Sequence, residues 1–201
     1  MPSINSLEKK AELLAPFLAQ LESITPLEAP VRDVLIEGST IVCADKDQVI
    51  RHEGDACLHL WVVLTGILRS YHYIGNTEVT SGFLKPYHIV ISIESFLTQT
   101  PAYETLQAME PSVLARIPYI ELDNLYHRFP SLNFIGRRLT GQYLFLTEQR
   151  LYMLRKQTAR DRYLFFLEHY PGLVNEIPLR YIASFLGINS ETLSRVRNSI
   201  R

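Results

Sequence analysis

Cysteine is scarce in this 201-residue sequence, which limits the kinds of protein it can be. Only Cys43 and Cys57 occur, without a C-x-x-C pair, so a dense disulfide scaffold and a cysteine-based zinc or redox motif do not fit. Long apolar runs are missing too, and none approaches the roughly 18 residues of a membrane span. The segment from Met1 to Glu12 lacks the basic-then-apolar order of a secretory signal. A cytoplasmic protein that does not enter membranes is therefore expected.

Signatures of catalysis are also absent. A metalloenzyme of the cupin type, built on a small β-barrel, needs several His and carboxylate ligands that converge on one metal. The histidines show neither H-x-H nor H-E-x-x-H spacing and are scattered at His52, His59, His72, His88, His127 and His169. Nucleophile-elbow (G-x-S-x-G) and P-loop motifs are not found either. The sequence therefore predicts no enzyme, no catalytic residue and no metal site, with a cupin-type metalloenzyme as the least favoured alternative.

Charge is unevenly distributed along the chain, although the net charge is only −1. Residues 150–201 carry nine Arg and Lys against four Asp and Glu, whereas residues 1–149 carry eleven against seventeen. A basic C-terminal quarter on an acidic body indicates that only this end meets a polyanion such as nucleic acid. An ordinary solvated helical surface would give a similar imbalance, so charge alone does not decide the function.

Start and stop signals for helices come first along the chain. Asn5, with Glu8 three residues later, is expected to cap a first helix that Pro16 kinks or splits. A second helix is expected to start at Thr25-Pro26, because threonine suits the cap and proline the first helical position. Gly38 lies where that helix should stop.

From Ser39 onward the hydrophobic pattern alternates instead of following a helical period. The segments are short and rich in β-branched and aromatic residues, and turn signals such as Glu53-Gly54-Asp55 and Gly75-Asn76 separate them. The expected strands cover residues 40–43, 48–51, 58–64, 67–74, 78–84, 88–93 and 103–118. Such closely spaced short strands, without βαβ alternation, predict a sandwich or a jelly-roll-type barrel.

Helical periodicity returns at about Ile120 and is longest after Pro130-Ser131. Apolar steps of three and four continue for about 25 residues, through Leu132, Ile135, Leu139, Tyr143, Leu146, Arg150 and Met153. A helix this long needs a partner for its apolar stripe, and we expect the same helix of a second subunit; packing on the chain's own β-domain is the alternative. Close approach of two backbones would explain why Gly136 and Gly141 are tolerated within it.

Two short helices are predicted near the C-terminal end. Thr158 starts a preceding helix that ends at Pro171-Gly172. Pro178 then begins a helix with one apolar face, which consists of Leu179, Ile182, Ala183 and Leu186. Gly187 supplies the positive φ of a sharp exit, and Asn189 caps the next helix. Helices joined in this way are typical of a DNA-reading helix-turn-helix, although an ordinary helical hairpin would share the pattern.

Polar side chains near the start of the last helix suit contacts with DNA. Arg195 can form two hydrogen bonds with guanine O6 and N7, and Glu191 can accept one from cytosine N4. Ser190, Thr192 and Ser194 can reach base edges or phosphates. Basic side chains that suit phosphate neutralisation are found at Arg180 and Arg197.

These motifs resemble those of the Crp–Fnr family of bacterial transcription regulators. The run Glu191-Thr192-Leu193-Ser194-Arg195 is similar to the family's E-T-[VL]-[SG]-R core, and Gly54-Asp55 with the segment 60–69 is similar to its G-D…L-Y-x-V-x-x-G-x-[VL]-R signature. The resemblance implies an α+β fold: an N-terminal jelly-roll-type β-roll like a cyclic-nucleotide-binding domain, a long dimerisation helix and a C-terminal helix-turn-helix. It also implies a homodimer that binds double-stranded DNA, contacts RNA polymerase and has Ser190, Glu191 and Arg195 near the bases. The family often has arginine where this chain has Ser190, so the preferred DNA sequence should differ.

The expected effector pocket departs from the family's pattern for cyclic nucleotides. A Gly-Glu pair and an Arg-Ser pair hold the ribose and phosphate in the family, and they align here near Ile91-Ser92 and Ala102-Tyr103. Residues 89–108 contain no arginine, and Glu94 is the available substitute for the missing carboxylate. A buried phosphate without a partner is costly, so cyclic AMP is not expected. Two cysteines per subunit do not supply an iron–sulfur cluster, and the effector, if any, is an unknown small molecule. No cofactor is expected.

The resemblance divides the chain into three parts: a β-roll sensor with N-terminal helices at 1–129, a dimerisation helix at 130–157, and a small all-α DNA-binding domain at 158–201. The family usually adds a β-hairpin wing after the recognition helix, and this sequence ends at Arg201, so a domain without a full wing is expected. A ligand-binding or interaction module with a degenerate DNA-binding domain therefore remains the main alternative.

Overall fold

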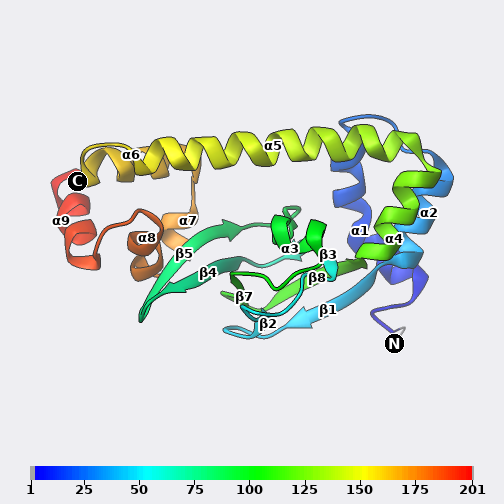
Figure 1. Ribbon diagram of the computed structural model, residues 1–201, viewed down its shortest axis with the longest axis horizontal. Coiled ribbons are helices and arrows are strands. Elements are labelled where there is room, and N and C mark those ends of the chain that lie inside the picture. The colour runs from blue at the N-terminus through cyan, green and yellow to red at the C-terminus, as the bar shows by residue number, and fades with distance from the viewer. Residues whose placement is uncertain (1–2, 201) are drawn as a thin grey trace. The chain divides into compact units, whose positions relative to one another are not determined.

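The computed structural model describes residues 3–200, so the expected domain ends at Met1 and Arg201 lie outside the described residues (Figure 1). The chain divides into two compact units. The first runs up to Ser70 and includes Phe83–Leu139; the second comprises Tyr71–Gly82 and the chain from Thr140 onward. The expected α+β class is confirmed, with antiparallel strands followed by helices.

Two four-stranded sheets form the β-region, with strand orders β1-β8-β3-β6 and β2-β7-β4-β5. In each sheet, most neighbouring strands are distant from each other in sequence, as in a jelly roll. The predicted jelly-roll-type β-region is therefore confirmed. The strands are β1 (Thr40–Ala44), β2 (Val49–Arg51), β3 (His59–Thr65), β4 (Leu68–Ile74), β5 (Thr77–Leu84), β6 (Ile89–Val90), β7 (Thr105–Ala108) and β8 (Ser112–Pro118).

Strand β3 is buried on both faces, so it carries an almost continuous apolar run. Successive side chains of a strand point to opposite faces. Trp61 and Val63 therefore contribute to one hydrophobic cluster, together with Leu68, Leu106 and Leu114. The alternate residues Leu60, Val62 and Leu64 belong to a second cluster, which the helices of the first unit cover.

Helices α1 (Leu7–Glu22), α2 (Ala29–Gly38) and α4 (Tyr119–Arg128) cover that second cluster. Their apolar faces bury Phe17, Leu35 and Leu125, each at most 5% exposed. The first residues of α5 (Pro130–Leu154) join the same cluster through Leu132 and Ile135. The N-terminal helices thus form part of the core of the first unit.

The expected caps of the two N-terminal helices are wrong, and the expected split at Pro16 is not found. Ser6 caps α1 by accepting a hydrogen bond from the Lys9 backbone N–H, because the Asn5 side chain instead bonds both backbone polar groups of Ile41. Pro16 lies inside α1 without splitting it; it is on the exposed side, where water can bond the carbonyl that loses its helical partner. Helix α2 starts at Ala29 rather than at Thr25-Pro26, with its proline one residue later.

The expected strand at 88–93 is also shorter than predicted. Strand β6 has two residues, and helix α3 (Ile93–Thr98) follows because Phe96 packs edge-on against Tyr119, with ring centroids 5.1 Å apart. The expected strand at 103–118 is two strands, β7 and β8, separated by a turn. A short apolar stretch does not distinguish a buried helical turn from a strand, which explains the missed α3.

The second unit is mainly helical. It contains the C-terminal half of α5, then α6 (Ala159–His169), α7 (Leu173–Glu176), α8 (Leu179–Phe185) and α9 (Ser190–Ile200). Thr158 caps α6 as predicted, since its hydroxyl accepts a hydrogen bond from the Asp161 N–H. Phe166 and Phe185 are almost fully buried and pack together with centroids 6.0 Å apart, so aromatic packing joins α6 to α8. The short α7 was not predicted.

Candidate nucleic-acid interface

A tight turn joins α8 to α9. The backbone N–H of Gly187 bonds the Ser184 carbonyl and that of Ile188 bonds the Ala183 carbonyl, so the end of α8 is hydrogen-bonded. Gly187 has φ +65°, a left-handed conformation that glycine adopts without strain. The Asn189 side-chain oxygen then accepts a hydrogen bond of 2.7 Å from the Thr192 N–H, which caps α9. Both expectations for this turn agree with the geometry.

Helix α9 has one buried side and one side open to solvent. Leu193 is fully buried, and Val196 and Ile200 are partly buried beside it. Neighbouring helices α6 and α8 cover this side (Figure 1). The polar residues Ser190, Glu191, Ser194, Arg195 and Asn198 are exposed, whereas Thr192 and Arg197 are half-buried. The helix therefore presents a continuous polar surface that its own unit leaves uncovered.

Glu191 and Arg195 lie one turn apart on that surface and bond each other. Arg195 Nη2 is 3.0 Å from Glu191 Oε1, and the side chains are 72% and 79% exposed. An exposed pair of this kind contributes only about 0.3–0.5 kcal/mol. The bond therefore orients both groups, while leaving them free to exchange partners with a ligand.

Arg180, on α8, has a different environment. Its Nη2 donates to the hydroxyl of Tyr181 at 2.8 Å, and its guanidinium lies 4.6 Å from the Tyr181 ring centroid. The cation is held over an aromatic face, yet the residue stays exposed. Such an oriented surface cation suits contact with a phosphate rather than with a base edge.

Two side chains that hold α8 were not assigned this role from the sequence. Ser184 Oγ accepts a hydrogen bond from the Thr80 N–H at 2.9 Å and donates to the Glu78 carbonyl at 3.2 Å. Arg150 donates to the carbonyls of Thr80 and Ser81, and its guanidinium lies 4.9 Å from the Phe185 ring centroid. Arg150 is therefore engaged inside its own unit, which the apolar stripe predicted for α5 does not suggest.

A half-buried tyrosine completes the aromatic core beneath α8. Tyr170 packs against Phe166 and Phe185, with centroid distances of 5.2 and 5.4 Å. Burial raises the pKa of the Tyr170 hydroxyl, and the nearby positive charge of Arg150 partly offsets this effect. The ring thus remains neutral at physiological pH and acts as an apolar support for α8.

The five residues aligned with the family's nucleotide pocket have mixed environments. Ser92 and Ala102 are buried and Ile91 is half-buried, but Glu94 and Tyr103 are exposed. The Ser92 hydroxyl is buried without a hydrogen-bond partner. The Glu94 carboxylate is thus on the surface, which does not suit the buried ribose contact expected of it.

An arginine from outside the aligned segment does reach this region. Arg51 Nη2 lies 3.3 Å from the Glu104 carbonyl and 3.5 Å from Glu104 Oε1, and its Nη1 lies 3.1 Å from Cys57 Sγ. Both charged side chains are little exposed, at 7% and 13%. Because Glu104 compensates the charge, a phosphate would have to compete with a carboxylate for Arg51.

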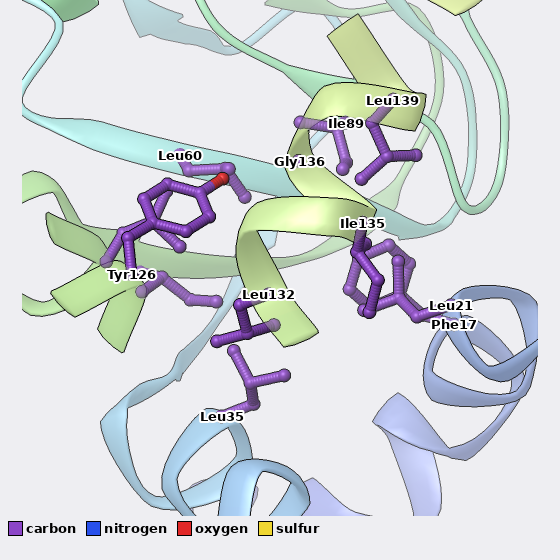
Figure 2. A pocket seen from close by; sticks show the side chains of 12 residues that line it. Phe17, Leu21, Leu35, Leu60, Ile89, Tyr126, Leu132, Ile135, Gly136 and Leu139 are labelled. Carbon is purple, nitrogen blue, oxygen red and sulfur yellow. The ribbon is translucent and has the colours of Figure 1, made fainter. Parts of the chain in front are cut away.

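An apolar cavity of about 40 Å³ lies among β3, α1, α4 and the start of α5 (Figure 2). Its lining includes Phe17, Leu60 and Ile135, and Tyr126 supplies the one polar side chain. Burial raises the pKa of that tyrosine, which therefore stays neutral. Without a cation or a hydrogen-bonding cluster, this cavity does not suit a nucleotide phosphate.

Gly136 borders the same cavity and shows why a small residue is needed there. A Cβ atom at this position would lie 2.8 Å from the Tyr126 hydroxyl and 3.1 Å from the ring. The close neighbour is therefore a side chain of the same subunit, whereas a second backbone was the expected reason. Nothing lies within 4 Å of a Cβ built at Gly141.

Residues 3–200 provide neither a metal-binding cluster nor a membrane-spanning helix. No three His, Cys, Asp or Glu side chains in this range are grouped so that they could hold a metal ion. Within the same range, every helix is too short or too polar to cross a membrane.

Known proteins resemble the chain in sequence. A family model described as the cyclic nucleotide-binding domain matches residues 41–129. The regulatory protein HlyX of Actinobacillus pleuropneumoniae is 24% identical over 201 residues, covering 92% of this chain and 79% of HlyX. The transcriptional activator protein FnrA of Stutzerimonas stutzeri is 26% identical over 163 residues, covering 75% of this chain and 66% of FnrA.

Solved structures resemble it in fold. A CooA mutant from Carboxydothermus hydrogenoformans has a TM-score of 0.67 at 20% identity, covering 83% of this chain and 77% of CooA. FixK2 from Bradyrhizobium japonicum also has a TM-score of 0.67, at 19% identity, covering 81% of this chain and 84% of FixK2. The sequence relatives are regulators rather than enzymes, which removes the cupin-type alternative. The chain is therefore similar in sequence to Fnr-type transcription regulators over most of its length, and residues 41–129 match a cyclic nucleotide-binding domain.

Proposed function

We propose that this chain is a dimeric regulator that binds double-stranded DNA through α9. The observation that carries this proposal is the two-sided character of that helix: Leu193 is fully buried, whereas Glu191 and Arg195 are 79% and 72% exposed. A helix that displays charged and hydroxyl side chains on a surface its own unit leaves uncovered has the form of a recognition helix for the major groove.

Base reading is assigned to the first turns of α9. Arg195 would grip a guanine, and Glu191 would accept a hydrogen bond from a cytosine. The two side chains bond each other at 3.0 Å, so they lie close enough together to suit neighbouring bases. Ser190, Ser194 and Thr192 would add contacts to base edges or phosphates, while Arg180 and Arg197 would neutralise phosphates.

Dimerisation is assigned to the C-terminal half of α5. Leu132 and Ile135 are buried in the first unit, but the later residues Leu144, Phe145 and Tyr152 are 58–60% exposed. Large apolar side chains so exposed on a long helix favour a second copy of that helix as their partner. Two recognition helices in such a dimer would enter successive major grooves, about 34–36 Å apart, on a pseudo-palindromic site.

The proposed organisation keeps a sensor at 1–129, a dimerisation helix at 130–157 and a DNA-binding domain at 158–201. The effector is proposed to be a small molecule other than cyclic AMP, near Ile91, Ser92, Glu94, Ala102 and Tyr103. The pairing of Arg51 with Glu104 supports this, because the positive charge of that buried arginine is already compensated. Contact with RNA polymerase and a cytoplasmic location are proposed on the resemblance to Crp–Fnr regulators.

Selection of bound sequences from random DNA with the purified full chain tests the proposal. A pseudo-palindromic motif with half-sites one helical turn apart is expected. Binding without any sequence preference, or no binding at low salt, would instead support the degenerate module. Sedimentation at the same protein concentration shows whether the binding species is a dimer.

A further inference from the structure

We infer that Arg162 is a positioning residue that ties the turn before the recognition helix to the end of α5. This inference rests on the proposed function, because it concerns how α9 is held for DNA. Arg162 belongs to the first turns of α6, is half-buried, and is not among the residues proposed to touch DNA.

The side chain of Arg162 bonds two places far apart in the chain. Its Nε donates to the Lys156 carbonyl at 3.1 Å, in the segment between α5 and α6. Its Nη1 donates to the Leu186 carbonyl at 3.2 Å and to the Gly187 carbonyl at 3.5 Å, in the turn between α8 and α9. One guanidinium therefore bridges the junction after α5 and the turn before α9.

The base of this side chain is itself fixed. Thr158 caps α6, and its hydroxyl also donates to the Asp161 carboxylate at 2.7 Å. The Arg162 backbone N–H bonds the Thr158 carbonyl at 3.2 Å. Since the first turn of α6 is held by its cap, the guanidinium has a rigid support from which to act.

The carbonyls that Arg162 bonds are ones that the helix leaves without a partner. The last carbonyls of a helix have no intrahelical donor and carry partial negative charge, so a cation there is favoured. Backbone N–H groups already serve the carbonyls of Ile182, Ala183 and Ser184. Arg162 bonds the carbonyls of Leu186, which caps α8, and of Gly187, the residue after the cap.

Packing at Gly187 supports the same assignment independently. A Cβ built there would lie 3.5 Å from Arg162 Nη1 and 3.7 Å from Leu154 Cδ2. The turn therefore rests on both the guanidinium and the last residue of α5. Because α9 starts only three residues after Gly187, these contacts determine where the recognition helix begins relative to α5.

Only arginine suits this geometry. Its planar group directs Nε–H and Nη–H donors along different, fixed directions, so it can bond Lys156 and the turn together. Lysine keeps the positive charge but concentrates its donors on one nitrogen, and it cannot span both places. Its Nε and Nη1 donors are engaged with protein carbonyls, so we expect Arg162 to position the turn rather than to contact a DNA phosphate.

The test compares Arg162→Lys and Arg162→Gln with Arg160→Ala in the full chain. Arg160 is an exposed arginine two residues earlier on α6, and its loss removes the same charge. We expect both Arg162 variants to bind the selected DNA about 10- to 100-fold more weakly than the unaltered chain, the range for hydrogen bonds to a charged group. Arg160→Ala should bind within about threefold of it.

Salt dependence and half-site spacing distinguish positioning from contact. Loss of a phosphate contact would reduce the slope of log K against log salt by about 0.9, whereas a positioning residue leaves the slope unchanged. DNA sites with one or two extra base pairs between half-sites should be discriminated less by the Arg162 variants. A reduced slope with retained spacing preference would overturn the inference.

A further measurement needs neither DNA nor a substituted chain. Solvent exchange of the Arg162 Nε–H, followed by nuclear magnetic resonance, should be slow, because that hydrogen is bonded to Lys156. Fast exchange would overturn the positioning role of Arg162 and leave the proposed DNA binding intact. Wild-type affinity and spacing preference in both Arg162 variants would have the same consequence. If the unaltered chain binds no DNA, the proposed function fails, but the exchange measurement still decides the role of Arg162 in the fold.

Discussion

Replacing Arg195 with alanine separates base reading from folding. The side chain is 72% exposed, and its partner Glu191, at 3.0 Å, is 79% exposed. A surface pair of this kind contributes about 0.3–0.5 kcal/mol. The free energy of unfolding of Arg195→Ala should therefore stay within about 0.5 kcal/mol of the unaltered chain, as measured by urea denaturation.

The expected loss on DNA is much larger and specific to one base pair. A bidentate arginine–guanine contact provides about 1–3 kcal/mol of discrimination, which corresponds to roughly 5- to 150-fold in affinity. The variant also leaves the Glu191 carboxylate without its cation close to the DNA, so the change should lie toward the weaker-binding end of this range. At the other positions of the site, base preference should persist.

Fluorescence anisotropy with the selected site, and with all four bases at each position of a half-site, measures this effect. Arg160→Ala serves as the control, because it removes an equal charge from α6 without touching α9. Uniform weakening at every sequence, with a smaller salt slope, would show that Arg195 contacts only phosphate. A large fall in the free energy of unfolding would show a structural role; either result refutes the assignment.

Three further changes test other parts of the account. Phe145→Glu places a charge on the exposed apolar surface of α5, so sedimentation should show mostly monomer and anisotropy should show loss of specific DNA binding; an unchanged dimer would remove α5 as the interface. Gly136→Ala should destabilise the chain by about 1–2 kcal/mol in urea denaturation despite the better helix propensity of alanine, because its Cβ would lie 2.8 Å from the Tyr126 hydroxyl. The same substitution in a chain that also carries Tyr126→Leu should be less destabilising. Equal effects with and without Tyr126→Leu would contradict this cause. Millimolar cyclic AMP should leave the thermal midpoint unchanged, since Glu104 already pairs with Arg51; a rise of several degrees would contradict the proposed exclusion.

Features encoded by local sequence were the ones that could be predicted. The cap at Asn189, the positive φ of Gly187 and the buried Leu193 follow from residues within one or two turns of each other. The alternation of strands and the length of α5 follow likewise from periodicity. For this reason the outline of the fold and the exposed side of α9 could be predicted from the sequence alone.

Contacts between distant segments were the ones that could not be predicted. Arg51 and Glu104 are 53 residues apart, and Ser184 meets the Thr80 backbone across 104 residues. The sequence does not distinguish Arg162 from other basic residues on helices, since the T-x-x-D start indicates only that α6 begins there. The close contact of Tyr126 with Gly136 was not predicted, because Tyr126 comes from the preceding helix.

The most direct test of the central claim is a disulfide crosslink between α9 and a base. Ser194→Cys is placed in a chain with Cys43→Ser, which removes the exposed native cysteine, and is mixed with DNA carrying a thiol tether on a major-groove base edge. The account predicts rapid crosslinking at one base position of each half-site, and none from Asn175→Cys, an exposed residue of α7. Equal crosslinking from both cysteines, or from neither while the DNA is bound, would show that α9 does not enter the major groove.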